Sequence, residues 1–221
     1  MKISPEKLDE LIKIVHLAGI EIIKIYKKKV TKKYKSDNTP VTNADIRAND
    51  IICKGLKLHF PNISIVSEEQ VKKGKAAKKF WLVDPLDGTK EFLKGNGEFT
   101  VNIGLIENKK PVFGIIYMPT KNKLYFTKDK KSYFSKLSKK GQLTNIRKIK
   151  VKKRNKNIVI LSRSHSLAKS EIEKAKKMIF QRFNANKIIR SGSSIKLCYI
   201  AHGLANVYPR FGTTMEWDTA A

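Results

Sequence analysis

Two aspartates three residues apart follow an apolar run in the middle of this 221-residue chain. The segment from Trp81 to Phe92 is Trp-Leu-Val-Asp-Pro-Leu-Asp-Gly-Thr-Lys-Glu-Phe. We expect a buried strand to end at Asp84, Pro85 to break it, and a helix to begin near Gly88 or Thr89. Carboxylates at a strand end can converge on one point, and a helix start offers unpaired N–H groups beside them. Because hard cations prefer carboxylate oxygens and phosphates prefer such amides, this segment favours phosphoryl-transfer chemistry.

Other acidic residues decide whether this pattern is more than a turn. An Asp-Pro-x-Asp-Gly sequence alone is also typical of a turn held by an aspartate hydrogen bond. Here Glu68 and Glu69 follow another apolar run, Asp45 follows Pro-Val-Thr-Asn-Ala, and Glu216-Trp-Asp218 stands near the last residue. Singly, each of these acids is more typical of a helix cap or an exposed surface. Together they favour one shared acidic site.

In this order the motifs resemble those of the inositol-monophosphatase superfamily. Its signature is Trp-x-x-Asp-Pro-x-Asp-Gly-Thr, preceded by Glu-Glu and followed by Trp-Asp near the C-terminus. Further segments resemble the bacterial 3′(2′),5′-bisphosphate nucleotidases of the CysQ type within that superfamily. They are Asp-Pro-Leu-Asp-Gly-Thr-Lys-Glu-Phe from Asp84, Asn-Gly-Glu-Phe-Thr-Val-Asn-Ile from Asn96, Ser-Arg-Ser-His from Ser162, Gly-Ser-Ser-Ile-Lys from Gly192 and Tyr-Pro-Arg-Phe-Gly from Tyr208. Inositol phosphatases usually have Thr-Asn-Phe where Thr-Lys-Glu-Phe stands. The resemblance extends from the first helix to the last residue.

The resemblance implies a metal site and a catalytic pair. It implies two or three Mg²⁺ ions, held by Glu68, Asp84, the backbone carbonyl of Leu86, Asp87 and Asp218. A water activated by the ions would attack phosphorus, with Thr89, hydrogen-bonded toward Asp45, orienting and deprotonating that water. Glu68 would act with them in catalysis. The amides of Gly88 and Thr89 would hold the phosphate oxygens.

It also implies a nucleotide site around the same ions. Residues matching His165, Ser193, Lys196 and Arg210 would surround the nucleotide, beside Glu68, Leu86, Asp87, Gly88, Thr89 and Asp218. Lys196 and Arg210 would face the non-reacting phosphate, although a solvated lysine is the alternative for Lys196. The implied reaction converts adenosine 3′,5′-bisphosphate to AMP and phosphate, belongs to sulfur assimilation and is inhibited by Li⁺. The alternatives in the same class are an inositol-monophosphate or fructose-1,6-bisphosphate phosphatase.

The formal net charge of +28 raises an alternative of another class. Such a charge would ordinarily indicate nucleic acid. Its lysines are scattered along the chain, and no stretch interleaves them with aromatic residues as a stacking surface would. We therefore interpret most of the charge as solvated surface, expect no nucleic acid, and expect a small anionic nucleotide as partner. A basic ligand- or nucleic-acid-binding protein, or an inactive truncated remnant, is the non-enzymatic alternative.

Hydrophobic periodicity places these motifs on a layered framework. Ser4-Pro-Glu predicts the start of a helix that runs to Tyr26, and Thr42-x-x-Asp45 predicts a capping box for a second helix that ends before Pro61. Strands are expected at 63–66 and 80–83, followed by an antiparallel meander over 99–106, 112–117 and 124–126.

The second half of the chain alternates strand and helix. Residues 128–156 have the weakest pattern, and we place a boundary there between a helix-plus-antiparallel-sheet metal-binding half, 1–150, and an α/β half, 151–221. In the latter we expect strands at 158–161, 187–190 and 206–210 and helices at about 170–183 and 194–202. The fold class is α+β with αβαβα layers, an inositol-monophosphatase-like sugar-phosphatase fold by the resemblance.

Chain end and cysteine usage give further expectations. Asp218 should open a helix, but only three residues follow it, so we expect a C-terminally incomplete fold, with a short form completed by a partner chain as the alternative. No apolar run has membrane-spanning length, and the N-terminus lacks the pattern of a secretory signal. Cys53 and Cys198 are expected to be buried free thiols, which favours a reducing, cytoplasmic setting. A monomer or a homodimer is expected.

Overall fold

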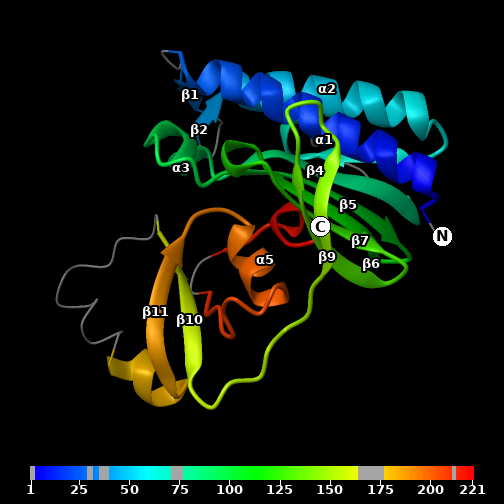
Figure 1. Ribbon diagram of the computed structural model, residues 1–221. Helices are drawn as coiled ribbons and strands as arrows, with labels where there is room; N and C mark the ends of the chain where they lie inside the picture. Colours follow the sequence, from blue (N-terminus) through cyan, green and yellow to red (C-terminus); the bar gives the residue numbers. More distant parts are fainter. Residues whose placement is uncertain (1–2, 29–31, 35–39, 71–76, 164–176, 211–212) are drawn as a thin grey trace.

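The computed structural model describes residues 3–28, 32–34, 40–70, 77–163, 177–210 and 213–221. Their elements stack in the expected αβαβα order (Figure 1). The pair α1 (Pro5–Tyr26) and α2 (Asn43–His59) covers one face of a seven-stranded sheet. On the other side of this sheet follow α5 (Ile195–Ala201), the parallel pair β10 (Asn157–Ser162) and β11 (Ala185–Ser191), and a helix at 177–182.

Both long helices begin where their caps predict. The Ser4 hydroxyl accepts a hydrogen bond from the Lys7 N–H at 3.3 Å, with Pro5 in the first turn of α1. In α2 the capping box is complete: the Thr42 N–H donates to Asp45 Oδ2 at 2.8 Å, and Thr42 Oγ1 accepts from the Ala44 N–H at 3.1 Å. These bonds satisfy N–H groups that have no partner inside the helix.

The central sheet holds most of the hydrophobic core. Its strands lie side by side in chain order, with β3 parallel to β4 and all other neighbours antiparallel. They are β3 (Ser64–Ser67), β4 (Lys79–Asp87), β5 (Thr100–Glu107), β6 (Lys110–Met118), β7 (Lys123–Lys128), β8 (Lys131–Leu137) and β9 (Leu143–Lys148). The predicted meander is therefore confirmed. Short elements complete the description: β1 (Lys32–Tyr34), β2 (Pro40–Thr42), α3 (Thr89–Leu93) and the 3₁₀ turns η1 (Glu68–Gln70), η2 (Pro119–Lys121) and η3 (Glu216–Asp218).

The structure places strands in the weakly patterned segment and corrects the predicted end of β4. Residues 128–156 contain the strands β8 and β9, and β9 is exposed along most of its length. An edge strand that buries so little needs no alternation of apolar residues, so its pattern is weak. Strand β4 does not end at Asp84 but continues past Pro85, because Asp87 pairs with Thr100 after a shift of register. The division of the chain at residue 150 stays a prediction.

The second half differs from expectation at its end. Residues 206–210 form no strand; Val207 makes a single bridge to Val159 of β10. The helix expected at 170–183 lies partly outside the described residues, and its described part is helical at 177–182. Asp218 does not open an α-helix, since it closes the three-residue turn η3.

Close packing of α1 on the sheet gives a test of the fold. A methyl group at Gly19 would lie 2.5 Å from Cε1 of the buried Tyr117 ring and 3.0 Å from Cβ of Pro119. Alanine gains up to about 1 kcal/mol in helix propensity over glycine, whereas overpacking costs about 1–3 kcal/mol. We expect Gly19→Ala to lower the unfolding temperature by a few degrees in thermal denaturation. Leu17→Ala, at a half-exposed position of the same helix, should change it little. A Gly19→Ala variant more stable than wild type would contradict this packing.

Candidate active site

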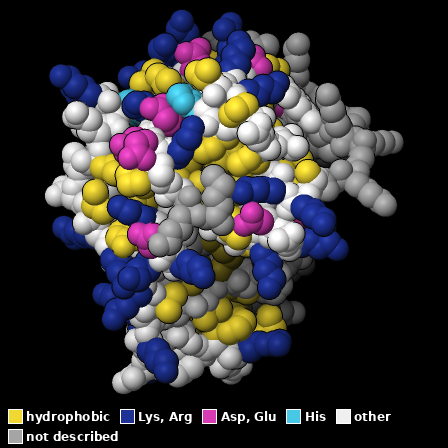
Figure 2. Space-filling view, turned by 90° about the vertical axis from the view of Figure 1, so that its right-hand side faces the viewer, with side chains coloured by type: hydrophobic (Ala, Val, Ile, Leu, Met, Phe, Trp, Pro, Cys, Tyr) yellow, Lys and Arg dark blue, Asp and Glu magenta, His cyan; other side chains and the backbone are white. Residues whose placement is uncertain are grey.

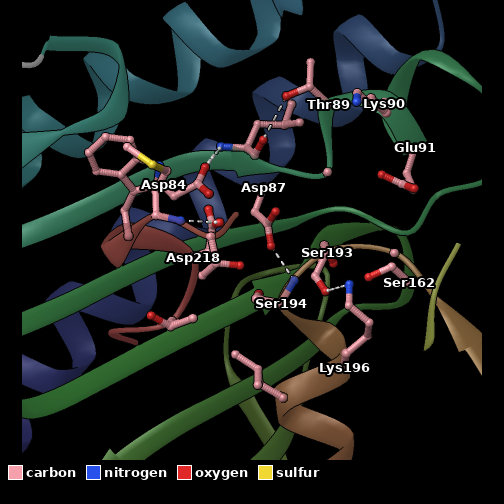
Figure 3. Close-up of a pocket in the computed structure, with 18 of the residues that line it drawn as sticks. Asp84, Asp87, Thr89, Lys90, Glu91, Ser162, Ser193, Ser194, Lys196 and Asp218 are labelled. Carbon is pink, nitrogen blue, oxygen red and sulfur yellow. Dashed lines mark hydrogen bonds between the residues drawn. The ribbon is translucent and has the colours of Figure 1, made fainter. Parts of the chain in front are cut away.

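Three carboxylates meet below the end of β4. Asp84 is 1% exposed, and one carboxylate oxygen from each of Asp84, Asp87 and Asp218 lies within 4.8 Å of the other two (Figure 3). Residues three apart on a regular strand point to opposite faces of its sheet. The register shift between Asp84 and Asp87 removes this alternation. The irregular strand end thus allows both side chains to face Asp218 on η3.

These carboxylates line a cavity of about 300 Å³ that also holds most of the other predicted site residues. Its walls include Glu68, Asp84, Leu86, Asp87, Gly88, Thr89, Ser193, Lys196, Arg210 and Asp218. Asp45 lies behind Thr89, and His165 lies outside the described residues. Glu68 is not one of the three that converge, but its charge is near enough to raise the pKa of Asp84 and of Asp87. The structure therefore brings together residues that are far apart in the sequence.

The predicted link between Thr89 and Asp45 is present. Thr89 Oγ1 lies 3.2 Å from Asp45 Oδ1 and 3.3 Å from the Leu86 carbonyl oxygen, so its single proton is shared between two acceptors. The other oxygen of Asp45 accepts from the N–H of Thr42 at 2.8 Å and from its hydroxyl at 2.6 Å. The cap of α2 therefore fixes the carboxylate that holds Thr89.

Burial and the proximity of like charges make it energetically unfavourable for all three carboxylates to be ionised. Burial raises the pKa of Asp84 well above its ordinary value, and the charges of Asp87 and Glu68 add to this shift. Burial, with the charge of Asp218, raises the pKa of Asp87 to about 6, against the opposing effect of Lys196. Burial also raises the pKa of Asp218. A divalent cation would offset this repulsion, and an all-oxygen donor set of carboxylates and a carbonyl is the set that Mg²⁺ prefers.

A buried cation stands on the opposite wall of the cavity. Lys196 is only 6% exposed, so the alternative of a solvated surface lysine was wrong. Its Nζ donates to the Ser193 carbonyl and lies 5.4 Å from the centre of the Tyr208 ring. Arg210 also lines the cavity, but its side chain is more exposed and it does not stand at a strand end as expected. Its guanidinium donates to Tyr208 Oη at 3.3 Å.

Sequence reasoning assigned no role to several residues that build this site. Arg163 makes two 2.7 Å hydrogen bonds to the carboxylate of Glu98, which also accepts from the Gly192 N–H at 2.6 Å. The Ser194 N–H donates to Asp87 Oδ2. All of these residues except Asp87 lay inside quoted motifs without an assigned role. The motifs contained the signal, but only the structure shows which atoms meet.

Comparison with known proteins agrees with this geometry. The model of the inositol monophosphatase family matches residues 5–221. The chain belongs to that family. It is 42% identical over 219 residues to the 3′(2′),5′-bisphosphate nucleotidase CysQ of Buchnera aphidicola, covering 97% of this chain and 78% of that protein. Against the protein of the same name from Escherichia coli strain K12, identity is 39%, with 97% and 84% covered.

Solved structures of the family share the fold. The crystal structure of CysQ from Bacteroides thetaiotaomicron superimposes with a TM-score of 0.74 at 36% identity, covering 96% of this chain and 82% of that one. Inositol monophosphatase TM1415 from Thermotoga maritima gives a TM-score of 0.76 at 22% identity, which shows the fold alone. Among the described residues, no helix combines the length and the apolar character that a membrane span requires.

The raised pKa of Asp87 predicts how the metal-free protein responds to pH. A carboxylate whose pKa is higher in the folded than in the unfolded chain lowers the free energy of unfolding as pH rises through that interval. For Asp87 the interval runs from 3.8 to about 6, and the loss amounts to at most about 3 kcal/mol. In EDTA, Asp87→Asn should gain stability over wild type as pH rises from about 4.5 to about 7.5.

Thermal unfolding at several pH values measures this difference. The matched control is Asp50→Asn, which removes an exposed carboxylate on α2. Its stability relative to wild type should stay level over the same interval. A difference between Asp87→Asn and wild type that does not change with pH would contradict the electrostatic description of the site.

Proposed function

We propose that this chain is a Mg²⁺-dependent phosphomonoesterase that converts adenosine 3′,5′-bisphosphate to AMP and phosphate. The observation that carries the proposal is the cavity with three converging carboxylates on one wall and the buried Lys196 on another. Such a cavity suits a cation and a phosphate ester together. The bisphosphate nucleotidase names of relatives near 40% identity support the choice of substrate.

In this proposal the acidic wall holds the ions. Glu68, Asp84, Asp87, Asp218 and the Leu86 carbonyl would bind two or three Mg²⁺. Bound Mg²⁺ supplies positive charge to the phosphate oxygens and lowers the pKa of a coordinated water. The amides of Gly88 and Thr89, beside Asp87, would bind the remaining phosphate oxygens.

Thr89 and Asp45 would orient the attacking water and accept its proton. Because the Thr89 hydroxyl points its own proton at Asp45 or Leu86, its oxygen can accept a hydrogen bond from water on the cavity side. Burial raises the pKa of Asp45, which favours its acting as a proton acceptor through Thr89. The capping box keeps Asp45 in the orientation that this step needs.

The second phosphate and the nucleoside would occupy the basic side. Lys196 Nζ uses one of its three N–H groups to donate a hydrogen bond to the Ser193 carbonyl, and within the described residues it makes no ion pair. Arg210 adds a second cation to the rim. Ser193 and, by the resemblance alone, His165 complete the proposed nucleotide contacts. Inositol monophosphate and fructose 1,6-bisphosphate remain the competing substrates.

The surface charge supports a small substrate over a nucleic acid. On the face shown in Figure 2, Lys and Arg side chains are spread between apolar and acidic groups and form no continuous basic track. The free thiols Cys53 and Cys198 are both buried, which supports the proposed reducing, cytoplasmic setting. We propose a monomer or a homodimer.

A substrate panel tests the proposal. We expect phosphate release from adenosine 3′,5′-bisphosphate in Mg²⁺, its loss in EDTA and its recovery when Mg²⁺ is restored. The kcat/KM should exceed that for inositol 1-phosphate and fructose 1,6-bisphosphate by at least about tenfold, on the order of 1.4 kcal/mol. Equal turnover of inositol 1-phosphate would refute the substrate assignment but would leave the assignment as a phosphatase in place. RNA binding with no phosphate release from any substrate would refute the proposal that the chain is an enzyme.

Thr89 gives a separate test of the proton step. Thr89→Val keeps the shape of the side chain and removes its hydroxyl, so kcat should fall about 100-fold or more. Its Mg²⁺ dependence in a thermal-shift titration should stay close to wild type, because the acidic wall is unchanged. Thr89→Ser is the matched control and should retain most of the activity. A Val variant with wild-type kcat would remove Thr89 from the mechanism.

A further inference from the structure

Ser194, immediately before α5, joins three parts of the site. It is 4% exposed and lies on the cavity wall. Its N–H donates to Asp87 Oδ2, as Figure 3 shows. Its hydroxyl lies 2.9 Å from Asn102 Oδ1 and 2.9 Å from Thr100 Oγ1, both on β5. The N–H of Ser194 thus contacts β4 and its hydroxyl contacts β5, which ties the start of α5 to both strands.

The chemistry of these groups sets the direction of the hydrogen bonds. The Asn102 Oδ1 atom can only accept, so the Ser194 hydroxyl donates its single proton there. The Thr100 hydroxyl then donates to Ser194. Asn102 is 1% exposed and pairs in register with Asp84, which puts both side chains on the same face of the sheet. The anchor of Ser194 therefore lies beside the buried metal-site carboxylate.

This arrangement makes the two oxygens of Asp87 unequal. Oδ2 accepts the Ser194 N–H, whereas Oδ1 accepts no hydrogen bond from the described residues. An amide bond to one oxygen fixes the plane of the carboxylate and leaves the other oxygen for a cation. Lys196, two residues after Ser194, also places a positive charge near Asp87, which partly opposes the rise in the pKa of that carboxyl. The start of α5 thus supplies both an orienting donor and a neighbouring charge.

We propose that Ser194 is a positioning residue that sets the Mg²⁺ affinity of the site by holding Asp87 through its N–H while its hydroxyl anchors it to Thr100 and Asn102. This inference rests on the proposed Mg²⁺ site. Removing the hydroxyl leaves the N–H in place but frees the turn that carries it. Asp87 can then rotate, and each bound ion must first order its ligand again. The consequence is weaker Mg²⁺ binding with the chemical step unchanged.

The experiment is a Mg²⁺ titration of the metal-free chain, followed by thermal shift and by calorimetry. Ser194→Ala, which removes both hydroxyl hydrogen bonds, should raise the dissociation constant for Mg²⁺ about tenfold or more. The isosteric Thr100→Val, which removes only the bond between Thr100 and Ser194, should raise it by less. The double variant should be no weaker than Ser194→Ala alone, because both changes break one chain. Saturating Mg²⁺ should restore most of kcat for the bisphosphate.

Ser191→Ala is the matched control. Ser191 lies in the same segment, is also 4% exposed, and its hydroxyl makes no hydrogen bond within the described residues. The Ser191→Ala variant should bind Mg²⁺ with wild-type affinity. A lower unfolding temperature of this variant in EDTA would report only on the stability of the fold. Wild-type Mg²⁺ affinity in Ser194→Ala, or additive losses in the double variant, would overturn the positioning role alone. A wild-type chain that does not respond to Mg²⁺ would overturn the proposed metal site and this inference together.

Discussion

Repulsion between desolvated carboxylates is the main electrostatic cost that the fold must offset. Asp84, Asp87 and Asp218 converge within 4.8 Å, and burial is the largest cause of the raised pKa of each. No chain brings such groups together unless the surrounding fold holds them firmly. Here the core of the central sheet does so, because β4 and β5 are buried over most of their lengths. The stability of the sheet allows an electrostatically unfavourable cluster of carboxylates that could hold a cation.

The two sides of the cavity come from different layers of the fold. The sheet and η3 supply the acidic side, and the first turn of α5 supplies Lys196. Hydrogen bonds join the two sides: Glu98, just before β5, accepts from Arg163 and from the Gly192 N–H. Charge-assisted bonds of this kind are stronger than neutral ones and fix orientation as well as distance. The relative position of cation and carboxylates is therefore set by specific contacts across the cavity.

Two backbone positions make this close approach possible. Gly88 has φ of 96°, and a Cβ there would lie 2.9 Å from the Glu98 carbonyl oxygen and 3.2 Å from Ser193 Cβ. Ser193 itself adopts a left-handed φ of 46°, which a serine rarely does. Such backbone strain persists only where surrounding contacts determine it, and it is common at functional sites. The hydrogen bonds of Gly192 and Ser194 on either side provide those contacts.

Features that depend on neighbouring residues could be predicted from the sequence alone. The caps at Ser4 and Thr42 and the helical and meander periods are local signals, and the structure confirms them. The acidic motifs are local signals too, and the structure brings three of their carboxylates together. Features that depend on strand pairing and on side-chain burial could be seen only in the tertiary structure. The register shift beyond Asp84, the exposed edge strand β9 and the burial of Lys196 have no local signature, because each is set by strands or helices distant in the chain. Motifs named the residues, and long-range packing decided which of their atoms meet.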